Sequence, residues 1–215
     1  MKRTRLLLAD DHKIILDGLR SLLESEFEIV GTAGDGRALV AAMEQLRPDV
    51  IVVDISMPLL NGIEAVRQIK KLDKRVKVIF LTMHPDVTYA IRAFEAGASG
   101  YVLKHSASSE LLTAIHEAIK GRTYVTPLIA GELLQAYKGE TYGQAEEMEQ
   151  LTQRQREILQ LLVDGNSAKE IANLLNISPR TVEFHKYNMM SKLNLKSLSA
   201  LIQYGIKHGF ASVEG

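Results

Sequence analysis

The chain has 215 residues, of which 46% are hydrophobic and 24% charged, and its formal net charge is zero. This is an ordinary globular composition, long enough for one large domain or two smaller ones. The absence of cysteine excludes disulfide frameworks and thiolate metal sites. No apolar run reaches the roughly 18 residues of a membrane span, and the stretch after Met-Lys-Arg-Thr-Arg is too short for a signal peptide, so we expect a cytoplasmic protein without a membrane partner.

The balanced charge hides an uneven distribution along the chain. Residues 1–125 carry 17 basic and 16 acidic side chains. Residues 126–149 carry one basic and five acidic side chains, and residues 150–215 carry eight basic and five acidic ones. We therefore expect a first domain at 1–125, an acidic linker at 126–149 and a mildly basic domain at 150–215. A basic domain is compatible with nucleic-acid binding, but charge alone is weak support.

Residues 1–125 alternate strand-like and helix-like patterns. Continuous apolar runs cover residues 6–9, 50–53, 78–81 and 101–103, and residues 27–31 predict a further strand. Apolar residues at helical spacing follow each of these segments. Such runs are typical of strands that are buried on both faces of a parallel sheet. We predict an α/β domain with a five-stranded, parallel, doubly wound sheet and helices on both faces.

Four of these runs end at residues suited to phosphoryl chemistry, namely Asp10-Asp11, Asp54, Thr82 and Lys104. Because ligands of open α/β sheets bind at the carboxyl ends of the strands, we expect these groups to meet at one edge of the sheet. Taken singly, an aspartate here is a helix cap, Thr82 a β-branched strand end and Lys104 a surface lysine. Their occurrence at successive strand ends favours a site.

Three carboxylates at one edge require positive charge. Two unit charges about 4 Å apart repel by roughly 4 kcal/mol at an effective dielectric constant of about 20. Lys104 supplies one cation, and hard oxygen ligands suit Mg²⁺ better than Zn²⁺. With both in place, one carboxylate is able to attack phosphorus and form an aspartyl-phosphate, whose oxygens would meet the metal, the ammonium and the Thr82 hydroxyl.

The remainder of the chain carries only helical patterns. Pro127 predicts the start of a short helix inside the linker, which then becomes polar and acidic. Thr152 and Gln155 match a capping box, and Ser178 followed by Pro179 suits the start of a longer helix. Together with a last helix over about residues 197–206, these signals predict an all-α, four-helix domain that contains a helix-turn-helix.

The strand-end residues also carry a family resemblance. The first domain resembles the receiver domain of two-component response regulators over residues 5–122, through Asp10-Asp11, Asp54-Ile55-Ser56-Met57-Pro58, Gly62, Thr82, Tyr101 and Lys104. The resemblance implies a flavodoxin-like fold in which Asp54 is the phosphoacceptor and a sensor histidine kinase is the partner. It also implies that Mg²⁺ is bound by Asp10, Asp11, Asp54 and the Ser56 backbone carbonyl.

The same resemblance assigns the other positions. It implies that Lys104 binds the phosphoryl oxygens and that Thr82 and Tyr101 form a switch pair. Receivers commonly carry proline after the lysine, in a cis peptide, whereas this chain has His105. The geometry of the Lys104–His105 peptide is therefore left open.

Residues 150–208 resemble the LuxR-type DNA-binding domain. The matching positions are Leu151 to Leu159, Gly165, Ser167, Lys169 to Ala172, Ile177-Ser178, Thr181-Val182, His185 and Lys192-Leu193. With the receiver, the whole chain is similar to the NarL/FixJ subfamily of response regulators. This resemblance implies sequence-specific binding to double-stranded DNA.

The helix that begins at Pro179 is expected to enter the major groove. We place Val182, His185, Met189 and Leu193 on its inner face, and Thr181, Glu183, Phe184, Lys186 and Tyr187 on its outer face. Glu183 is a candidate acceptor for cytosine N4, while Lys169, Lys186 and Lys196 are candidates for phosphate contacts. For Phe184, contact with a thymine methyl and simple closure of the helix surface both remain open.

We therefore predict a transcription regulator, not an enzyme, controlled by phosphorylation of Asp54. The last helix has a wider apolar face than a three-helix core requires, which predicts a homodimer on an inverted repeat. One rival is an aspartyl-phosphate phosphatase, but that chemistry needs a second carboxylate where Ser56 stands. Another rival is a regulator that binds DNA without phosphorylation, and the complete acidic set argues against it.

Overall fold

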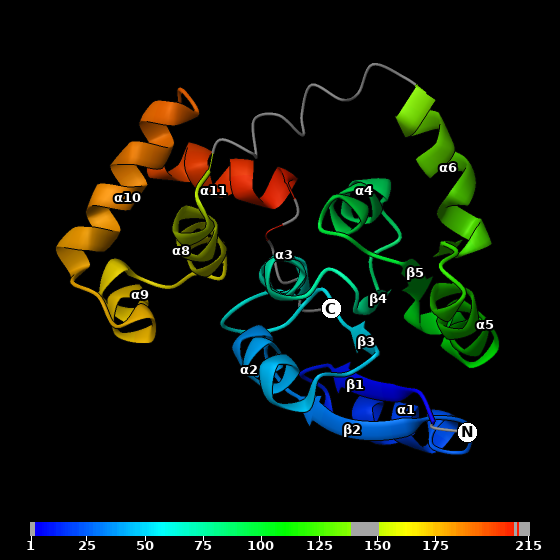
Figure 1. Ribbon diagram of the computed structural model, residues 1–215. Helices are drawn as coiled ribbons and strands as arrows, with labels where there is room; N and C mark the ends of the chain where they lie inside the picture. The colour runs from blue at the N-terminus through cyan, green and yellow to red at the C-terminus, as the bar shows by residue number, and fades with distance from the viewer. Residues whose placement is uncertain (1–2, 139–150, 209, 211–215) are drawn as a thin grey trace. The chain divides into compact units, whose positions relative to one another are not determined.

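The computed structural model describes residues 3–138, 151–208 and 210 (Figure 1). The chain divides into two compact units, one that ends at Lys138 and one that follows it. Among the described residues, no helix combines the length and the apolar character that crossing a bilayer requires.

The first unit alternates strands and helices. In chain order these are β1 (Arg5–Ala9), α1 (Lys13–Leu23), β2 (Glu28–Ala33), α2 (Gly36–Leu46), β3 (Val50–Val53), α3 (Gly62–Leu72), β4 (Lys77–Thr82), α4 (Val87–Glu95), β5 (Gly100–Leu103), the 3₁₀ turn η1 (Lys104–Ser106), α5 (Ala107–Ile119), β6 (Tyr124–Val125) and α6 (Pro127–Lys138). All strand pairs are parallel, in the order β2-β1-β3-β4-β5-β6. The predicted parallel, doubly wound sheet is confirmed.

The sheet has six strands instead of the predicted five. The additional strand, β6, has two residues and pairs with β5 at one edge of the sheet. The Thr126 N–H donates a hydrogen bond to the Tyr101 carbonyl (2.9 Å), which holds this segment in register. A strand this short has no periodicity that a sequence pattern can reveal.

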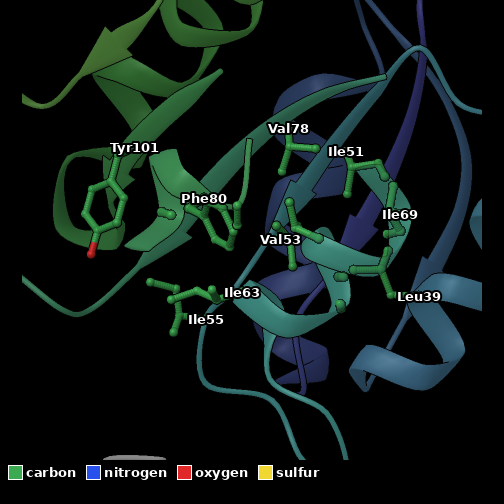
Figure 2. Close-up of a cluster of buried hydrophobic side chains, with 14 of the residues drawn as sticks. Leu39, Ile51, Val53, Ile55, Ile63, Ile69, Val78, Phe80 and Tyr101 are labelled. Atoms are coloured by element: carbon green, nitrogen blue, oxygen red, sulfur yellow. The ribbon is translucent and has the colours of Figure 1, made fainter. Parts of the chain in front are cut away.

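Two apolar layers cover the two faces of the sheet. Leu7 and Ala9 of β1 face one layer, which includes residues of α2, α3, α4 and α6, whereas Leu6 and Leu8 face the other, which includes residues of α1 and α5. Figure 2 shows the centre of the first layer, where Val53 and Phe80 lie near Ile63 of α3. Because side chains alternate along a strand, fully apolar strands fill both layers at once.

Helix α6 belongs to the first unit, although the charge pattern placed residues 126–149 in a linker. Its side chains Ile129 and Leu133 are buried in the same layer as α4. The expected boundary at residue 125 therefore differs from the structure, because two apolar side chains one turn apart attach the helix to the first unit. The rest of the expected linker, residues 139–149, lies outside the described residues.

The second unit consists of helices, as predicted. The helices are α8 (Gln153–Val163), α9 (Ala168–Leu175), α10 (Pro179–Lys192) and α11 (Leu198–Lys207). The capping box of Thr152 and Gln155 is present, and the Ser178 hydroxyl accepts from the Thr181 N–H (3.1 Å) at the start of α10. Val182 and Met189 are fully buried, while His185 and Leu193 are only partly buried on the expected inner face.

The start of α3 lies directly against the end of β3. A Cβ atom on Gly62 would lie 2.0 Å from the Asp54 carbonyl oxygen, and the Gly62 N–H donates to the Ile55 carbonyl (2.9 Å). Only glycine permits this approach. The residue therefore fixes the loop that follows Asp54.

We predict that Gly62→Ala destabilises the first unit by about 3 kcal/mol or more, because a methyl group against backbone forces the loop apart. The measurement is chemical unfolding of the full chain followed by circular dichroism. Gly18→Ala is the matched control, since Gly18 lies on the exposed side of α1 with nothing within 4 Å of an added Cβ. That variant should be up to about 1 kcal/mol more stable, and equal effects of the two substitutions would contradict the prediction.

Candidate functional site

The ends of β1 and β3 bring two aspartates together. Ala9 pairs with Val53, so the residues that follow, Asp10 and Asp54, emerge side by side, and the Asp54 N–H donates to the Ala9 carbonyl (2.8 Å). The chain order of the sheet reverses between these two strands, since β1 has β2 on one side and β3 on the other. Such a reversal is where open α/β sheets place their ligands.

A buried ammonium bridges the two carboxylates. The Lys104 Nζ atom lies 2.7 Å from Asp10 Oδ2 and 2.7 Å from Asp54 Oδ2, and the three side chains are 9%, 2% and 4% exposed. The other oxygen of Asp54, Oδ1, accepts a hydrogen bond from the Ile55 N–H (2.7 Å). The pairing of Thr82 with Leu103 brings Lys104 to this edge of the sheet from β5. The Lys104–His105 peptide is trans.

Burial and charge act in opposite directions on this cluster. Burial raises the pKa of Asp54, with a further contribution from Asp10, and this outweighs the lowering effects of Lys104 and the Ile55 N–H. Burial also disfavours the charged form of Lys104, but Asp54 and Asp10 outweigh it and hold the pKa of Lys104 above its ordinary value. The ammonium is therefore permanently charged, and one cation does not fully compensate the buried carboxylates.

Asp11 lies at the outer side of the cluster. Its Oδ1 atom is 2.9 Å from His12 Nδ1, which is also 3.2 Å from Asp10 Oδ1. Ligand atoms of Asp10, Asp11 and His12 all lie within 4.8 Å of one another. Three carboxylates against one ammonium leave excess negative charge and hard oxygen donors, so the residues fit a divalent ion such as Mg²⁺.

Thr82 and Tyr101 are connected through the backbone of His84. The His84 N–H donates to the Thr82 hydroxyl (3.3 Å), and the Tyr101 hydroxyl donates to the His84 carbonyl (2.9 Å). Both side chains are fully buried, and Figure 2 shows the Tyr101 ring beyond Phe80. Burial raises the pKa of Tyr101, so its hydroxyl remains a hydrogen-bond donor.

The His84 side chain forms a second connection. Its Nε2 atom lies 2.7 Å from Ser56 Oγ, two residues after Asp54, and its ring stacks on Tyr89 of α4 with centroids 4.1 Å apart. Burial lowers the pKa of His84, so its ring is neutral near pH 7. One residue thus contacts the loop after β3, Thr82, Tyr101 and α4.

Sequence reasoning missed His12 and His84. His12 directly follows the aspartate pair, and His84 lies two residues beyond Thr82. Their proximity to a strand end was the available signal, but a lone histidine there has no periodic pattern that separates it from a loop residue.

In the second unit, the expected DNA-binding residues differ in exposure. Lys169, Phe184, Tyr187 and Lys196 are exposed, whereas Thr181, Glu183 and Lys186 are partly buried. The Lys186 ammonium pairs with Glu183 Oε1 (2.8 Å) one turn earlier on α10, and the Lys186 side chain is only 14% exposed. The outward assignment therefore fits Phe184 and Tyr187 best, because the two charged neighbours satisfy each other along the helix.

Comparisons with known proteins agree with both units. Residues 6–116 match the response regulator receiver domain, and residues 149–205 match the bacterial regulatory proteins of the luxR family. The chain is 36% identical to the transcriptional regulatory protein MctR of Rhizobium johnstonii, covering 99% of this chain and 98% of that protein. It is 35% identical to the oxygen regulatory protein NreC of Staphylococcus epidermidis, covering 94% and 97%.

Solved structures of response regulators are also similar to this chain. The fold is similar to RcsB from Salmonella enterica serovar Typhimurium bound to promoter DNA in the presence of the phosphomimetic BeF₃⁻, with 29% identity, a TM-score of 0.61 and coverage of 94% and 98%. A structure of two RcsB dimers bound to two parallel DNAs is 27% identical, with a TM-score of 0.61 and coverage of 97% and 100%.

The family so identified consists of transcription factors, not enzymes, in agreement with the sequence prediction. The receiver match spans the acidic cluster, and the luxR match spans the helix-turn-helix. The chain belongs to the response regulators of the NarL/FixJ type, with a receiver domain followed by a LuxR-type DNA-binding domain.

Proposed function

We propose that this response regulator is phosphorylated on Asp54 by a sensor histidine kinase, and that this modification controls its binding to double-stranded DNA. The supporting observation is the position of Lys104 Nζ, 2.7 Å from both Asp10 and Asp54, at the strand ends. A nucleophilic carboxylate with a fixed cation beside it is the arrangement that acyl-phosphate formation requires.

Asp10, Asp11, Asp54 and the Ser56 backbone carbonyl are the groups that would hold Mg²⁺. The bound ion supplies positive charge for the carboxylates and for the phosphoryl oxygens. Lys104 orients Asp54 and shifts toward the phosphoryl group as it arrives. An Asp54 oxygen forms the new bond to phosphorus while the bond between phosphorus and the histidine nitrogen of the kinase breaks. The imidazole ring of that histidine takes up a proton and leaves as a neutral group.

The switch follows from the hydrogen bonds of Thr82. In the unmodified protein the Thr82 hydroxyl accepts from the His84 N–H. A phosphoryl group on Asp54 offers strong acceptor oxygens, and the Thr82 hydroxyl turns to donate to one of them. The His84 backbone then moves, together with the Tyr101 hydroxyl that donates to its carbonyl. This movement displaces α4, because the His84 ring stacks on Tyr89 of that helix.

The second unit is the DNA reader. Helices α9 and α10 form the helix-turn-helix, and α10 would enter the major groove with Thr181, Glu183, Phe184 and Tyr187 near base edges. Lys169, Lys186 and Lys196 would contact phosphates, with Lys186 first leaving its pair with Glu183. The RcsB structures bound to DNA, at 27% and 29% identity, support this assignment.

The phosphorylated protein would bind DNA as a homodimer through α11. Leu198 and Ile206 of this helix are exposed while Leu201 is fully buried, so α11 has an apolar stripe beyond the one that its own unit covers. A symmetric pair of these stripes would present two copies of α10 to an inverted repeat. The structure of two RcsB dimers bound to two parallel DNAs supports the binding of DNA as a dimer.

We predict that acetyl phosphate and Mg²⁺ raise the affinity of the wild-type protein for its selected DNA site by about 5- to 150-fold, the usual range of coupling between two sites. Asp54→Asn should show no increase, because the amide does not accept a phosphoryl group. The measurement is fluorescence anisotropy, with phosphorylation followed by mass spectrometry. Asp17→Asn, an exposed aspartate on α1, is the control, and an unphosphorylated variant with full affinity would support constitutive binding.

We predict that Mg²⁺ stabilises the wild-type protein against thermal unfolding by about 2.7 kcal/mol at a hundredfold excess over its dissociation constant. Asp54→Asn and Asp11→Asn should lose most of this effect, while Asp17→Asn keeps it. Equal stabilisation of all four proteins, measured by scanning calorimetry, would place the ion elsewhere.

The same scans in EDTA test the electrostatics of Asp54. Because its pKa in the folded protein is raised by burial, the ionised carboxylate destabilises the fold at pH values above its ordinary pKa of 3.8. Asp54→Asn should therefore unfold at a higher temperature than the wild type near pH 7. This advantage should shrink as the pH falls through the raised pKa of the folded state, and it should vanish below 3.8, where the carboxyl group is protonated in both states.

We predict that Ile206→Glu abolishes dimer formation by the phosphorylated protein, since a charge in the apolar stripe would have to be buried. The variant should bind a full inverted repeat and a half-site equally, whereas the wild type prefers the full site. Ser199→Glu, also exposed on α11, is the control. Sedimentation that shows a wild-type monomer binding one half-site as tightly as the full site would exclude the dimer.

A further inference from the structure

Helix α10 leaves two aromatic rings in solvent. Phe184 is 61% exposed and Tyr187 is 66% exposed, while Val182 and Met189 on the other side of the helix are fully buried. Residues three apart lie on the same face of successive turns, so the two rings are neighbours. Adjacent exposed rings on an otherwise polar outer face of a helix mark an interaction surface.

The charged residues beside the rings do not dominate this surface. Glu183 and Lys186 form an ion pair at 2.8 Å, and Lys186 is 14% exposed. Exposed cations lie instead at the two ends of the helix, Arg180 in the first turn and Lys192 in the last. An apolar centre between basic ends is complementary to a major groove, where base edges lie between two phosphate backbones.

We propose that Phe184 and Tyr187 form a thymine reader, which recognises the C5 methyl groups of thymine in the major groove. This inference rests on the proposed DNA-binding function and deepens it. Phe184 has no hydrogen-bonding group, and the thymine methyl is the apolar feature that base edges present in that groove. The ring of Phe184 also lies edge-on to His185, with centroids 5.9 Å apart, which supports its orientation.

The test removes only the methyl group. The phosphorylated full-length protein first selects its preferred duplex from random DNA, and each thymine of that duplex is then replaced singly by deoxyuridine, which keeps every base-pairing group. At each contacted thymine the replacement should weaken binding about fourfold, equivalent to ~0.8 kcal/mol for one buried CH₂-sized group. In Phe184→Ala and Tyr187→Ala, replacing thymine by deoxyuridine at the position that the missing ring contacts should no longer change the affinity.

Two control variants separate base reading from general affinity. Tyr187→Phe should keep the thymine-to-uracil ratio, because the methyl contact uses the ring. Lys196→Ala should weaken binding to both duplexes equally while keeping the ratio, since a phosphate contact carries no sequence information. Thermal unfolding of both alanine variants should match the wild type, because the truncated side chains are exposed.

Several outcomes would overturn the inference. If a sequence is selected but deoxyuridine has no effect at any thymine, the thymine reader is wrong while the DNA-binding function stands. The thymine reader is equally wrong if both alanine variants retain the ratio, or if they change the oligomeric state instead of base preference. If no sequence is enriched and all duplexes bind alike, the proposed sequence-specific function fails together with the inference.

Discussion

The site depends on one interaction, the placement of the Lys104 ammonium between the carboxylates of Asp10 and Asp54. Each contact is 2.7 Å long, and all three side chains are almost fully buried. Without the cation, two buried negative charges would repel each other across adjacent strand ends. The register of β1 against β3 and of β4 against β5 brings the three residues together, so the packing of the sheet determines the electrostatics of its edge.

This cluster connects to the rest of the first unit through the loop after β4. His84 contacts Thr82 and Tyr101 through its backbone and Ser56 and Tyr89 through its side chain. A displacement at the strand ends therefore has a short path of hydrogen bonds and ring contacts to α4. For the proposed switch, the physical basis is that the Thr82 oxygen accepts from the His84 N–H in this structure, so a rotation of the side chain that brings its hydroxyl to a phosphoryl oxygen would move this acceptor relative to His84.

Helix α10 of the second unit has one side that packs in the core and one side that is exposed, where we propose that DNA is recognised. Val182 and Met189 anchor α10 in the core of the unit, and the ion pair of Glu183 with Lys186 covers part of its outer side. The cap at Ser178 fixes where the helix begins. These local signals make α10 a rigid support, which is what the proposed recognition of DNA by its few exposed side chains requires.

The class of both units and the edge at which the candidate site lies follow from the amino-acid sequence alone. Apolar runs that end in Asp10-Asp11, Asp54, Thr82 and Lys104 predict strand ends, and parallel strands necessarily present those ends at one edge. Three features became visible only in the folded chain: α6 joins the first unit, β6 extends the sheet, and His84 connects the loop after β3 with α4. The reason is that the spacing of apolar residues in the sequence predicts which face of a helix or strand is buried. Contacts between short, aperiodic segments have no such pattern, because they form only when residues far apart in the sequence meet in space.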